Sequence, residues 1–223
     1  MLGVVVPTRN EAASIGALVA QVRAALPGAT ILVVDDRSPD DPAGLARAAG
    51  AEVLTREGPP GLGRAYRDGF AYALAAGFDP IVQMDADLSH DPADVPRLVA
   101  ALDQADLVLG SRWVAGGGTV DWDRRRRLLS RFGSAYARAW LGLPQRDLTG
   151  GFKAWRAETL RNLEPATLRA EGYAFQVEAT FRAIQRGARV VEVPIVFTER
   201  RAGASKMSSR IAIEAAWRIP GLR

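Results

Sequence analysis

The chain contains no cysteine, only one histidine and no long apolar run. Without cysteine there can be no disulfide scaffold and no thiolate metal site, which suits a reducing compartment. No stretch reaches the ~18 consecutive apolar residues that a spanning helix needs. The opening "MLGVVVPT" turns polar too early for a secretory signal peptide. We therefore expect a chain without a spanning helix or a leader.

Two common phosphate-binding motifs are also missing. No Gly-x-Gly-x-x-Gly follows the first apolar run, and no Walker sequence occurs anywhere. The "GLG" at residues 61–63 is too short to count as a phosphate loop by itself. A standard dinucleotide-binding enzyme and a P-loop NTPase are therefore disfavoured.

The composition is that of a soluble globular protein with a basic balance. The 223 residues are 48% apolar and 24% charged, enough to bury a sizeable core. The net charge is +4 and the isoelectric point is near 9.9, which favours anionic partners such as phosphate ligands, a membrane surface or nucleic acid. Nucleic-acid binding is the alternative class. No interleaved aromatic motif or helix-turn-helix signature supports it, so we expect no nucleic-acid partner.

Apolar runs that predict strands alternate with segments of helical spacing through the first half of the chain. Alternation of this kind predicts parallel β-α-β units, and hence an α/β fold with a mostly parallel open sheet and helices on both faces. We expect a single domain over 1–223, with a nucleotide-binding half at 1–112 and an acceptor-binding half at 113–223. The predicted strands are 3–8, 30–36, 51–57, 80–87 and 105–112, and the predicted helices are 11–26, 42–50, 61–77 and 92–102.

Acidic residues follow two of these strands. Asp85 and Asp87 come directly after the run "PIVQ", where carboxylate oxygens at the strand end can bind a hard divalent cation. The alternative is a solvated turn in which Asp87 caps the next helix. Asp35 and Asp36 end the second strand, where an acid can accept hydrogen bonds from a base or a ribose. Their alternative is also a turn, since "DDRSPDD" is rich in turn formers.

The second half of the chain has a different pattern. We expect helices at 124–143, 172–187 and 208–219, a loop entering a strand at 147–156, and one long strand at 188–200. The sequence "AGGGT" at 115–119 is the expected mobile loop. The basic loop "RAGASKM" at 201–207 contains a glycine that favours movement.

The helix expected at 124–143 begins with four arginines and carries one apolar face. Arg127, Arg131 and Arg138 flank that face, which is the pattern of a helix at a membrane interface. Packing on the protein core is the alternative, favoured for part of the face, and arginine runs are often only solvated. The apolar residues are Leu128, Leu129, Phe132, Tyr136, Ala139, Trp140 and Leu143.

Eight motifs in order carry a resemblance to a known family. They are "VVVPTRNEA", "LVVDDRSPDD", "GLGRAYRDGF", "QMDADLSHDP", "LGSRW", "DLTGGFKAWR", "GYAFQVE" and "VPIVFTERRAGASKM". The chain resembles family 2 glycosyltransferases from residue 3 to about 210, and within them the polyprenol (dolichol) phosphate mannose synthase group. The resemblance implies a GT-A fold, a Mg²⁺ or Mn²⁺ cofactor, inversion at the sugar carbon and a lipid phosphate acceptor.

The resemblance also implies roles for individual residues. Nucleotide contacts fall on Pro7, Arg9, Glu11, Asp35, Asp36, Asp85 and Ala86, and metal contacts on Asp85, Asp87 and Ser89. Arg112, Arg126 and Ser130 match positions that meet phosphates or shape the acceptor site. Arg200 and Lys206 match a basic pair on a late loop that closes over the diphosphate. These five residues and Asp87 form the expected catalytic set. Gln176 and Glu178 match positions on the sugar side. The sequence departs from many relatives at "REGPPGLG", where they carry a more basic loop, and at Ser89, where they vary.

The implied reaction moves mannose from GDP-mannose to a polyprenyl phosphate. Such a phosphate is a dianion at neutral pH, because its second pKa is about 6, so no strong general base is required. This fits a chain whose one histidine, His90, lies in the metal-loop region, where we expect packing rather than base catalysis. A UDP-glucose donor and a hydroxyl acceptor are the enzymatic alternatives. We expect a peripheral enzyme on the cytoplasmic face of a membrane, with a separate transmembrane protein as an optional partner.

Overall fold

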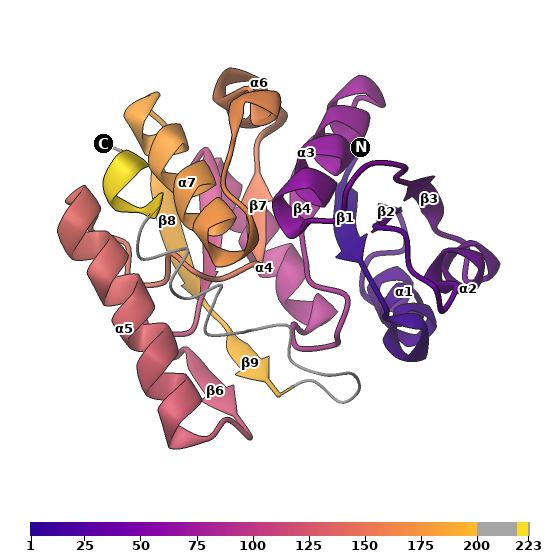
Figure 1. The fold of residues 1–223 in the computed structure, drawn as a ribbon, viewed down its shortest axis with the longest axis horizontal. Helices are drawn as coiled ribbons and strands as arrows, with labels where there is room; N and C mark the ends of the chain where they lie inside the picture. The colour runs from indigo at the N-terminus through magenta and orange to yellow at the C-terminus, as the bar shows by residue number, and fades with distance from the viewer. Residues whose placement is uncertain (200–217, 223) are drawn as a thin grey trace.

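The computed structural model describes residues 1–199 and 218–222, and its centre is a seven-stranded sheet (Figure 1). The strand order is β3-β2-β1-β4-β7-β5-β8. The strands are β1 (Gly3–Thr8), β2 (Thr30–Asp35), β3 (Glu52–Thr55), β4 (Ile81–Gln83), β5 (Leu107–Ser111), β7 (Lys153–Trp155) and β8 (Val190–Pro194). Only β7 is antiparallel to its neighbours, β4 and β5. The predicted α/β class with a mostly parallel sheet is confirmed.

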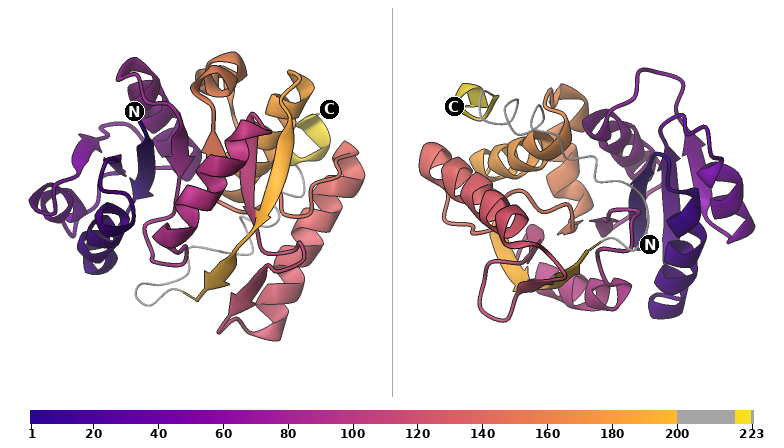
Figure 2. Two further views of the ribbon diagram at one scale, coloured as in Figure 1. Left: turned by 180° about the vertical axis from the view of Figure 1, so that it is seen from behind. Right: turned by 60° about the horizontal axis from the view of Figure 1, so that its bottom comes forward.

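Helices cover both faces of the sheet (Figure 2). The alternating side chains of β1 show which helices lie on each face. Val4 and Val6 face one side, where they pack with α1 (Ala12–Ala25), α2 (Pro42–Ala48) and α4 (Val95–Ala100). Val5 faces the other side, with α3 (Leu62–Ala75), α6 (Ala157–Leu163) and α7 (Gly172–Gln185). Side chains of successive strand residues point to opposite faces, so each apolar strand supplies both layers.

Several elements differ from the sequence prediction. The long strand expected at 188–200 breaks at Ile195, so β8 ends in the main sheet and β9 (Val196–Thr198) joins a second sheet. Its partner there is β6 (Gly118–Val120), which includes part of the loop expected to be mobile at 115–119. That expectation is wrong in part, because the Gly118 amide donates to the Ile195 carbonyl at 3.0 Å. Helix α6 was not predicted, and the helix expected at 208–219 lies mostly outside the described residues.

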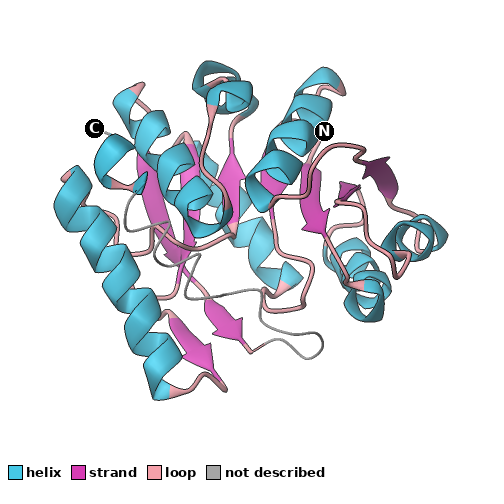
Figure 3. Ribbon diagram, in the orientation of Figure 1, coloured by secondary structure: helices cyan, strands magenta, loops and turns pink. Residues whose placement is uncertain are grey.

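Helix α5 (Arg124–Leu141) follows β6 in the chain and lies at the edge of the molecule (Figure 3). Asp123 caps it by accepting a hydrogen bond from the Arg126 amide at 2.8 Å. Only Ser134, Ala137 and Leu141 of this helix are buried, a narrow stripe at spacings of three and four residues. No helix in the described part of the chain is long and apolar enough to cross a bilayer.

Candidate active site

The polar strand ends meet at one edge of the sheet, as parallel pairing requires. β1 pairs with β2 and β4 in parallel, so Thr8, Asp35 and Asp85 leave the sheet on the same side. β7 enters at this edge because it runs the opposite way, and its register opposes Lys153 to Gln83. A cleft of about 490 Å³ opens here. It is the place where α/β sheets commonly bind ligands.

The cleft gathers nine of the nucleotide, metal, phosphate and sugar residues expected from the resemblance. The lining combines carboxylates with arginines and an apolar surface. The lining includes Pro7, Glu11, Asp85, Ala86, Asp87, Arg112, Arg126, Ser130 and Gln176, with Leu129, Phe132, Tyr136, Val177 and Phe197 as the apolar part. Arg200 and Lys206, which were expected to meet phosphates, lie outside the described residues.

Asp87 and Ser89 lie on a tight turn after β4. Leu88 between them has a φ of 61°, in the left-handed region that a leucine rarely adopts. This turn lets the Ser89 amide donate to the Asp87 carboxylate at 3.2 Å. The Ser89 hydroxyl is buried and has no hydrogen-bond partner among the described residues. The carboxylates of Asp85 and Asp87 and the Ser89 hydroxyl, on one segment after β4, are oxygen groups of the kind that a hard divalent cation prefers.

No cluster of three acidic, histidine or cysteine side chains close enough to hold a metal occurs among residues 1–199 and 218–222. The oxygens of Asp85, Asp87 and Ser89 therefore need others to complete a coordination sphere. Mg²⁺ and Mn²⁺ bound with phosphates usually take the missing ligands from the phosphates and water. The residues present fit a metal that binds together with a diphosphate.

His90 packs behind Asp85 rather than facing the cleft. Its ring stacks on Phe152 at 4.8 Å between centroids and meets Phe197 edge-on at 5.1 Å. The Asp85 amide donates to Nδ1 at 3.3 Å, which assigns the hydrogen of the neutral ring to Nε2. Burial lowers the pKa of His90, although the nearby Asp85 charge opposes that shift. His90 is thus neutral at pH 7 and serves as packing, as the sequence favoured.

Gly151 brings the backbone of the β7 segment against Asp85. A Cβ atom added at Gly151 would lie 2.8 Å from an Asp85 carboxylate oxygen, closer than such contacts allow. A side chain at position 151 would therefore displace the Asp85 carboxylate from its present place. The "GG" of residues 150–151 is the sequence signal for this close approach, and the sequence reasoning did not use it.

Arg112 is fixed by a fully buried acid. Its Nε and Nη2 donate to the two Asp147 oxygens at 2.7 Å each, and Nη2 also donates to the Thr149 hydroxyl at 3.1 Å. Burial disfavours the charged form of both groups. Their pairing outweighs burial, so the pKa of Asp147 lies below its ordinary value and the pKa of Arg112 lies above its ordinary value. The two N–H groups of Nη1 make no hydrogen bond within the described residues. Arg112 can therefore offer them to an anion in the cleft.

The other expected nucleotide residues divide between the cleft and its surroundings. Asp36 pairs with Arg56 and accepts a hydrogen bond from the Gly61 amide at 2.6 Å, so it holds the loop before α3. Asp35 accepts from the Ser38 amide at 3.3 Å. Neither acid lines the cleft, and neither does Arg9, whereas Glu11 does.

Gln176 and Glu178 lie on opposite sides of α7. Gln176 lines the cleft, and its amide oxygen accepts from Gln83 Nε2 at 2.8 Å. Glu178 accepts from the Arg169 and Ala170 amides at 3.0 and 2.7 Å and pairs with Arg182. Glu178 is thus away from the cleft, in a position that supports the loop before α7 rather than a sugar.

Lys153 is a buried cation that the sequence reasoning missed. Its ammonium donates to the Gln176 carbonyl and the Thr180 hydroxyl, both at 2.9 Å, beneath the cleft. Burial lowers the pKa of Lys153 to about 7, against the smaller opposing effects of Asp147 and Asp85. The unfolded chain keeps this proton to about pH 10.5. Between the two values the unfolded state binds more protons, so stability rises with pH.

We therefore expect the free energy of unfolding of the wild type to rise relative to that of Lys153→Met as pH increases from 7 to 9. The relative gain is at most about 1.4 kcal/mol per pH unit, because one proton is involved. Urea unfolding of both proteins at pH 7, 8 and 9 measures it. Parallel pH curves for the two proteins would show that Lys153 keeps an ordinary pKa in the fold.

The sequence of this chain matches known proteins over most of its length. Residues 3–163 match the family model described as Glycosyl transferase family 2. An undecaprenyl-phosphate mannosyltransferase of Micrococcus luteus is 46% identical over 216 residues, covering 95% of this chain and 89% of the relative. A polyprenol monophosphomannose synthase of Mycolicibacterium smegmatis is 43% identical over 223 residues, covering 97% and 84%.

Solved structures share the fold at lower identity. Glucosyl-3-phosphoglycerate synthase of Mycobacterium tuberculosis, in complex with phosphoglyceric acid, superposes with a TM-score of 0.78 at 23% identity, covering 99% of this chain and 80% of that one. The same enzyme with Mn²⁺, UDP and glucosyl-3-phosphoglycerate gives 0.77 at 23% identity and the same coverage. The fold is therefore GT-A-like, and the chain belongs to glycosyl transferase family 2 and is a glycosyltransferase.

Proposed function

We propose that this glycosyltransferase moves mannose from GDP-mannose to a polyprenyl phosphate, with inversion at the sugar carbon and with Mg²⁺ or Mn²⁺ as cofactor. The observation that carries the proposal is the composition of the cleft. The same cleft is lined by the paired acids Asp85 and Asp87, by the arginines Arg112 and Arg126, and by apolar side chains. The two relatives above, named for mannosyl transfer to polyprenyl phosphates, support the same acceptor class.

The acceptor half of the cleft suits a phosphate attached to a hydrocarbon. Arg112, Arg126 and Ser130 would hold the phosphate, and Leu129 and Phe132 beside them would receive the first isoprene units. A phosphate monoester with a second pKa of about 6 is already a nucleophile at pH 7. The neutral, buried His90 is therefore not needed as a base. The chain's part is to hold two polyanions at a reacting distance.

The donor half would hold the nucleotide and its metal. Asp85, Asp87 and Ser89 would bind the divalent ion, which when bound neutralises charge on the departing diphosphate. The fold-related synthase crystallised with Mn²⁺ and UDP supports a divalent ion at such a site. Pro7 and Glu11 on the β1 side line the nucleotide end of the cleft. Residues 1–112 would thus bind donor and residues 113–223 acceptor, with Arg200 and Lys206 proposed over the diphosphate.

A substrate screen tests this function. Purified protein is incubated with radiolabelled GDP-mannose, GDP-glucose, UDP-glucose or UDP-galactose and a short polyprenyl phosphate, with Mg²⁺, with Mn²⁺ or with a chelator. We expect labelled lipid from GDP-mannose only, and none in the chelator. Labelled lipid from UDP-glucose, with none from GDP-mannose, would contradict GDP-mannose as the donor and identify UDP-glucose instead. Transfer to an added sugar hydroxyl, with none to the lipid phosphate, would contradict the acceptor class.

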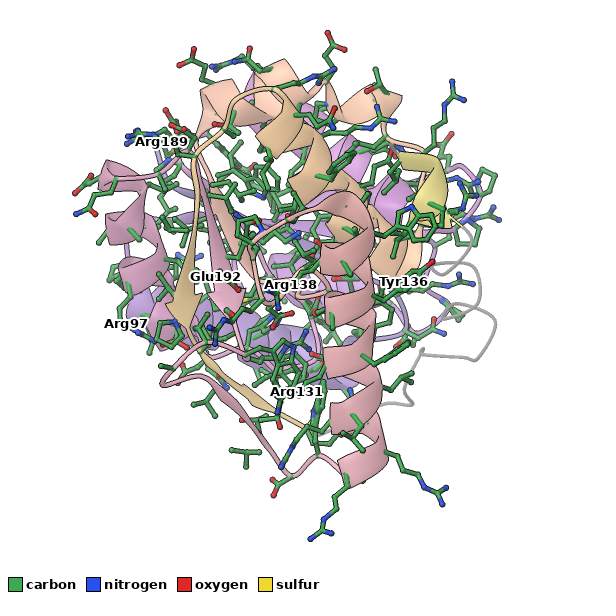
Figure 4. The ribbon with its side chains drawn as sticks, turned by 90° about the vertical axis from the view of Figure 1, so that its left-hand side faces the viewer. Arg97, Arg131, Tyr136, Arg138, Arg189 and Glu192 are labelled. Carbon is green, nitrogen blue, oxygen red and sulfur yellow. The ribbon has the colours of Figure 1, made fainter. Side chains whose placement is uncertain are left out.

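We further propose that the enzyme acts as a peripheral protein on the cytoplasmic face of a membrane, through the outer surface of α5. Leu128 is 68% exposed, Phe132 69% and Trp140 47%, so most of the apolar face found in the sequence is not buried. Arg131 and Arg138 lie on one side of this helix and Tyr136 on the other (Figure 4). Exposed apolar side chains with flanking arginines suit an interface of anionic headgroups. A separate transmembrane partner would be an additional anchor.

Glutamate substitutions on α5 should therefore weaken membrane binding. We expect the double variant Leu128→Glu and Trp140→Glu to bind anionic vesicles at least about tenfold more weakly, because two apolar groups leave the interface. Co-sedimentation with phosphatidylglycerol vesicles at low salt measures this. Leu45→Glu on α2, 46% exposed, is the matched control and should leave binding unchanged. Equal loss in both variants would point to general charge repulsion and against an α5 interface.

A further inference from the structure

The aromatic ring of Trp122 contacts both arginines of the proposed acceptor site. The Arg126 guanidinium carbon lies 4.3 Å from the Trp122 ring centroid, and that of Arg112 lies 5.5 Å from it. Both arginines are permanently charged, and the two distances keep their charges within about 10 Å of each other. Trp122 is itself 8% exposed and lines the cleft. One buried ring thus contacts two positively charged guanidinium groups.

The backbone around Trp122 is built to hold the ring in this place. β6 ends at Val120, whose carbonyl accepts from the Glu199 amide at 3.0 Å. Asp121 then has a φ of 63°, a left-handed turn that costs energy for a residue other than glycine. The next residue is Trp122, and Asp123 begins α5 as its cap. The ring is therefore fixed by a strand, a strained turn and a capped helix.

The ring is also packed from behind. Phe197 of β9 meets Trp122 edge-on, with 5.1 Å between centroids and 75° between planes. The Arg112 guanidinium lies 5.5 Å from the Phe197 centroid as well. Each arginine has its own acid, Asp147 for Arg112 and Glu199 for Arg126. The acids fix one edge of each guanidinium, and Trp122 is the group that the two arginines share.

We infer that Trp122 is a positioning residue, which holds Arg112 and Arg126 together at the acceptor phosphate by offering them its ring. Indole is the best aromatic partner for cations, since its faces are negative. The contact offsets the repulsion between the two guanidinium groups before the phosphate arrives. Arginines ordered in advance lose less entropy when the ligand binds. The inference rests on the proposed function, because it assigns the two arginines to the acceptor.

The test compares Trp122→Leu, which removes the ring, with Trp122→Phe, which keeps a smaller one. We expect Trp122→Leu to raise the KM for farnesyl phosphate about tenfold, with the donor KM and kcat within about twofold of wild type. Trp122→Phe should stay within about threefold for the acceptor. Tyr72→Leu, which removes an exposed aromatic ring on α3, is the control and should change neither KM. Circular dichroism and thermal unfolding establish that each variant is folded.

A double-mutant cycle distinguishes positioning from general damage to the site. In an Arg126→Gln background, Trp122→Leu should raise the acceptor KM by no more than about twofold, since the closer of the two arginines is already gone. A further tenfold rise in that background would overturn the inference. Equal losses in Trp122→Phe and Trp122→Leu would also overturn it, because the indole N–H rather than the ring face would then be responsible.

Equilibrium binding separates this inference from the proposed reaction. Calorimetric titration with farnesyl phosphate, without donor, should show the same tenfold weakening in Trp122→Leu. Binding by the wild type without any mannose transfer would remove the proposed reaction and leave the role of Trp122 standing. Absence of farnesyl phosphate binding by the folded wild type would overturn the inference itself.

Discussion

Asp87→Asn is expected to reduce sugar transfer by at least about a hundredfold while the protein stays folded. The substitution keeps the shape of the side chain and removes the charge that would hold a divalent ion at the diphosphate. The Ser89 amide can still donate to the remaining oxygen, so the turn should persist. Initial rates of labelled lipid formation at saturating Mg²⁺ or Mn²⁺, with thermal unfolding of the same preparation, measure the two effects.

Asp91→Asn is the matched control for this loop. Asp91 lies four residues further on, where its side chain accepts a hydrogen bond from the Ala93 amide at 2.9 Å. An asparagine can accept the same bond, and the residue does not line the cleft. We expect its rate to equal that of the wild type within about twofold. Full activity of Asp87→Asn in a chelator would show that transfer does not depend on a metal at this carboxylate.

Asp147→Asn is expected to destabilise the fold by about 3–5 kcal/mol and to abolish acceptor binding. The change leaves Arg112 charged in a buried position without its partner, which is the costly way to break such a pair. The Asp147 side chain is fully buried and contributes both oxygens. Urea unfolding at pH 7 measures the first effect. Asp106→Asn, in an ion pair whose Arg189 is 67% exposed, should cost no more than about 1 kcal/mol.

The pH dependence of this pair has a definite sign. The pKa of Asp147 is lowered in the fold by the charge and hydrogen bonds of Arg112, which outweigh the opposite effect of burial. Its stabilisation is therefore present above the unfolded pKa of about 3.9 and is lost as pH falls through the lower folded value. The Asp147→Asn variant should not show that loss. If Asp147→Asn and the wild type had equal free energies of unfolding at pH 7, that result would contradict a stabilising role for the buried ion pair.

A second double variant separates stability from catalysis. Replacing the pair by Arg112→Met and Asp147→Leu should restore much of the lost stability, because apolar groups can replace a buried ion pair. It should not restore transfer, since the two Nη1 N–H groups that we propose bind the phosphate are gone. Recovery of transfer in this double variant would show that Arg112 acts only as a structural element.

The architecture was predictable because its pattern is local. Each buried strand of the first half is a short β-branched run followed by a helix-spaced segment, and these periods determine a parallel sheet. The antiparallel β7 was not predictable as such, since its three residues carry no period of their own. The break at Ile195, which separates β8 from β9, also depends on which strands are available as partners rather than on local sequence.

The candidate site divides in the same way. Asp85 and Asp87 could be found because they follow a strand directly, and the resemblance supplied Arg112 and Arg126. Asp147 could not be assigned from sequence, because only the fold brings it to Arg112, which lies 35 residues earlier. Trp122 adjoins the arginine run, but its contacts with both arginines depend on the turn at Asp121. Lys153 looks like any strand lysine until the sheet and α7 enclose it.

The most direct measurement is ³¹P NMR of the reaction of purified enzyme, GDP-mannose, Mg²⁺ and farnesyl phosphate. We predict that the phosphate monoester signal of the lipid is replaced by a phosphodiester signal. Proton spectra of the product should then show mannose in the β configuration, inverted from the donor. Persistence of the monoester while GDP-mannose is consumed would contradict the proposal, because the sugar would then have gone to an acceptor other than the lipid phosphate.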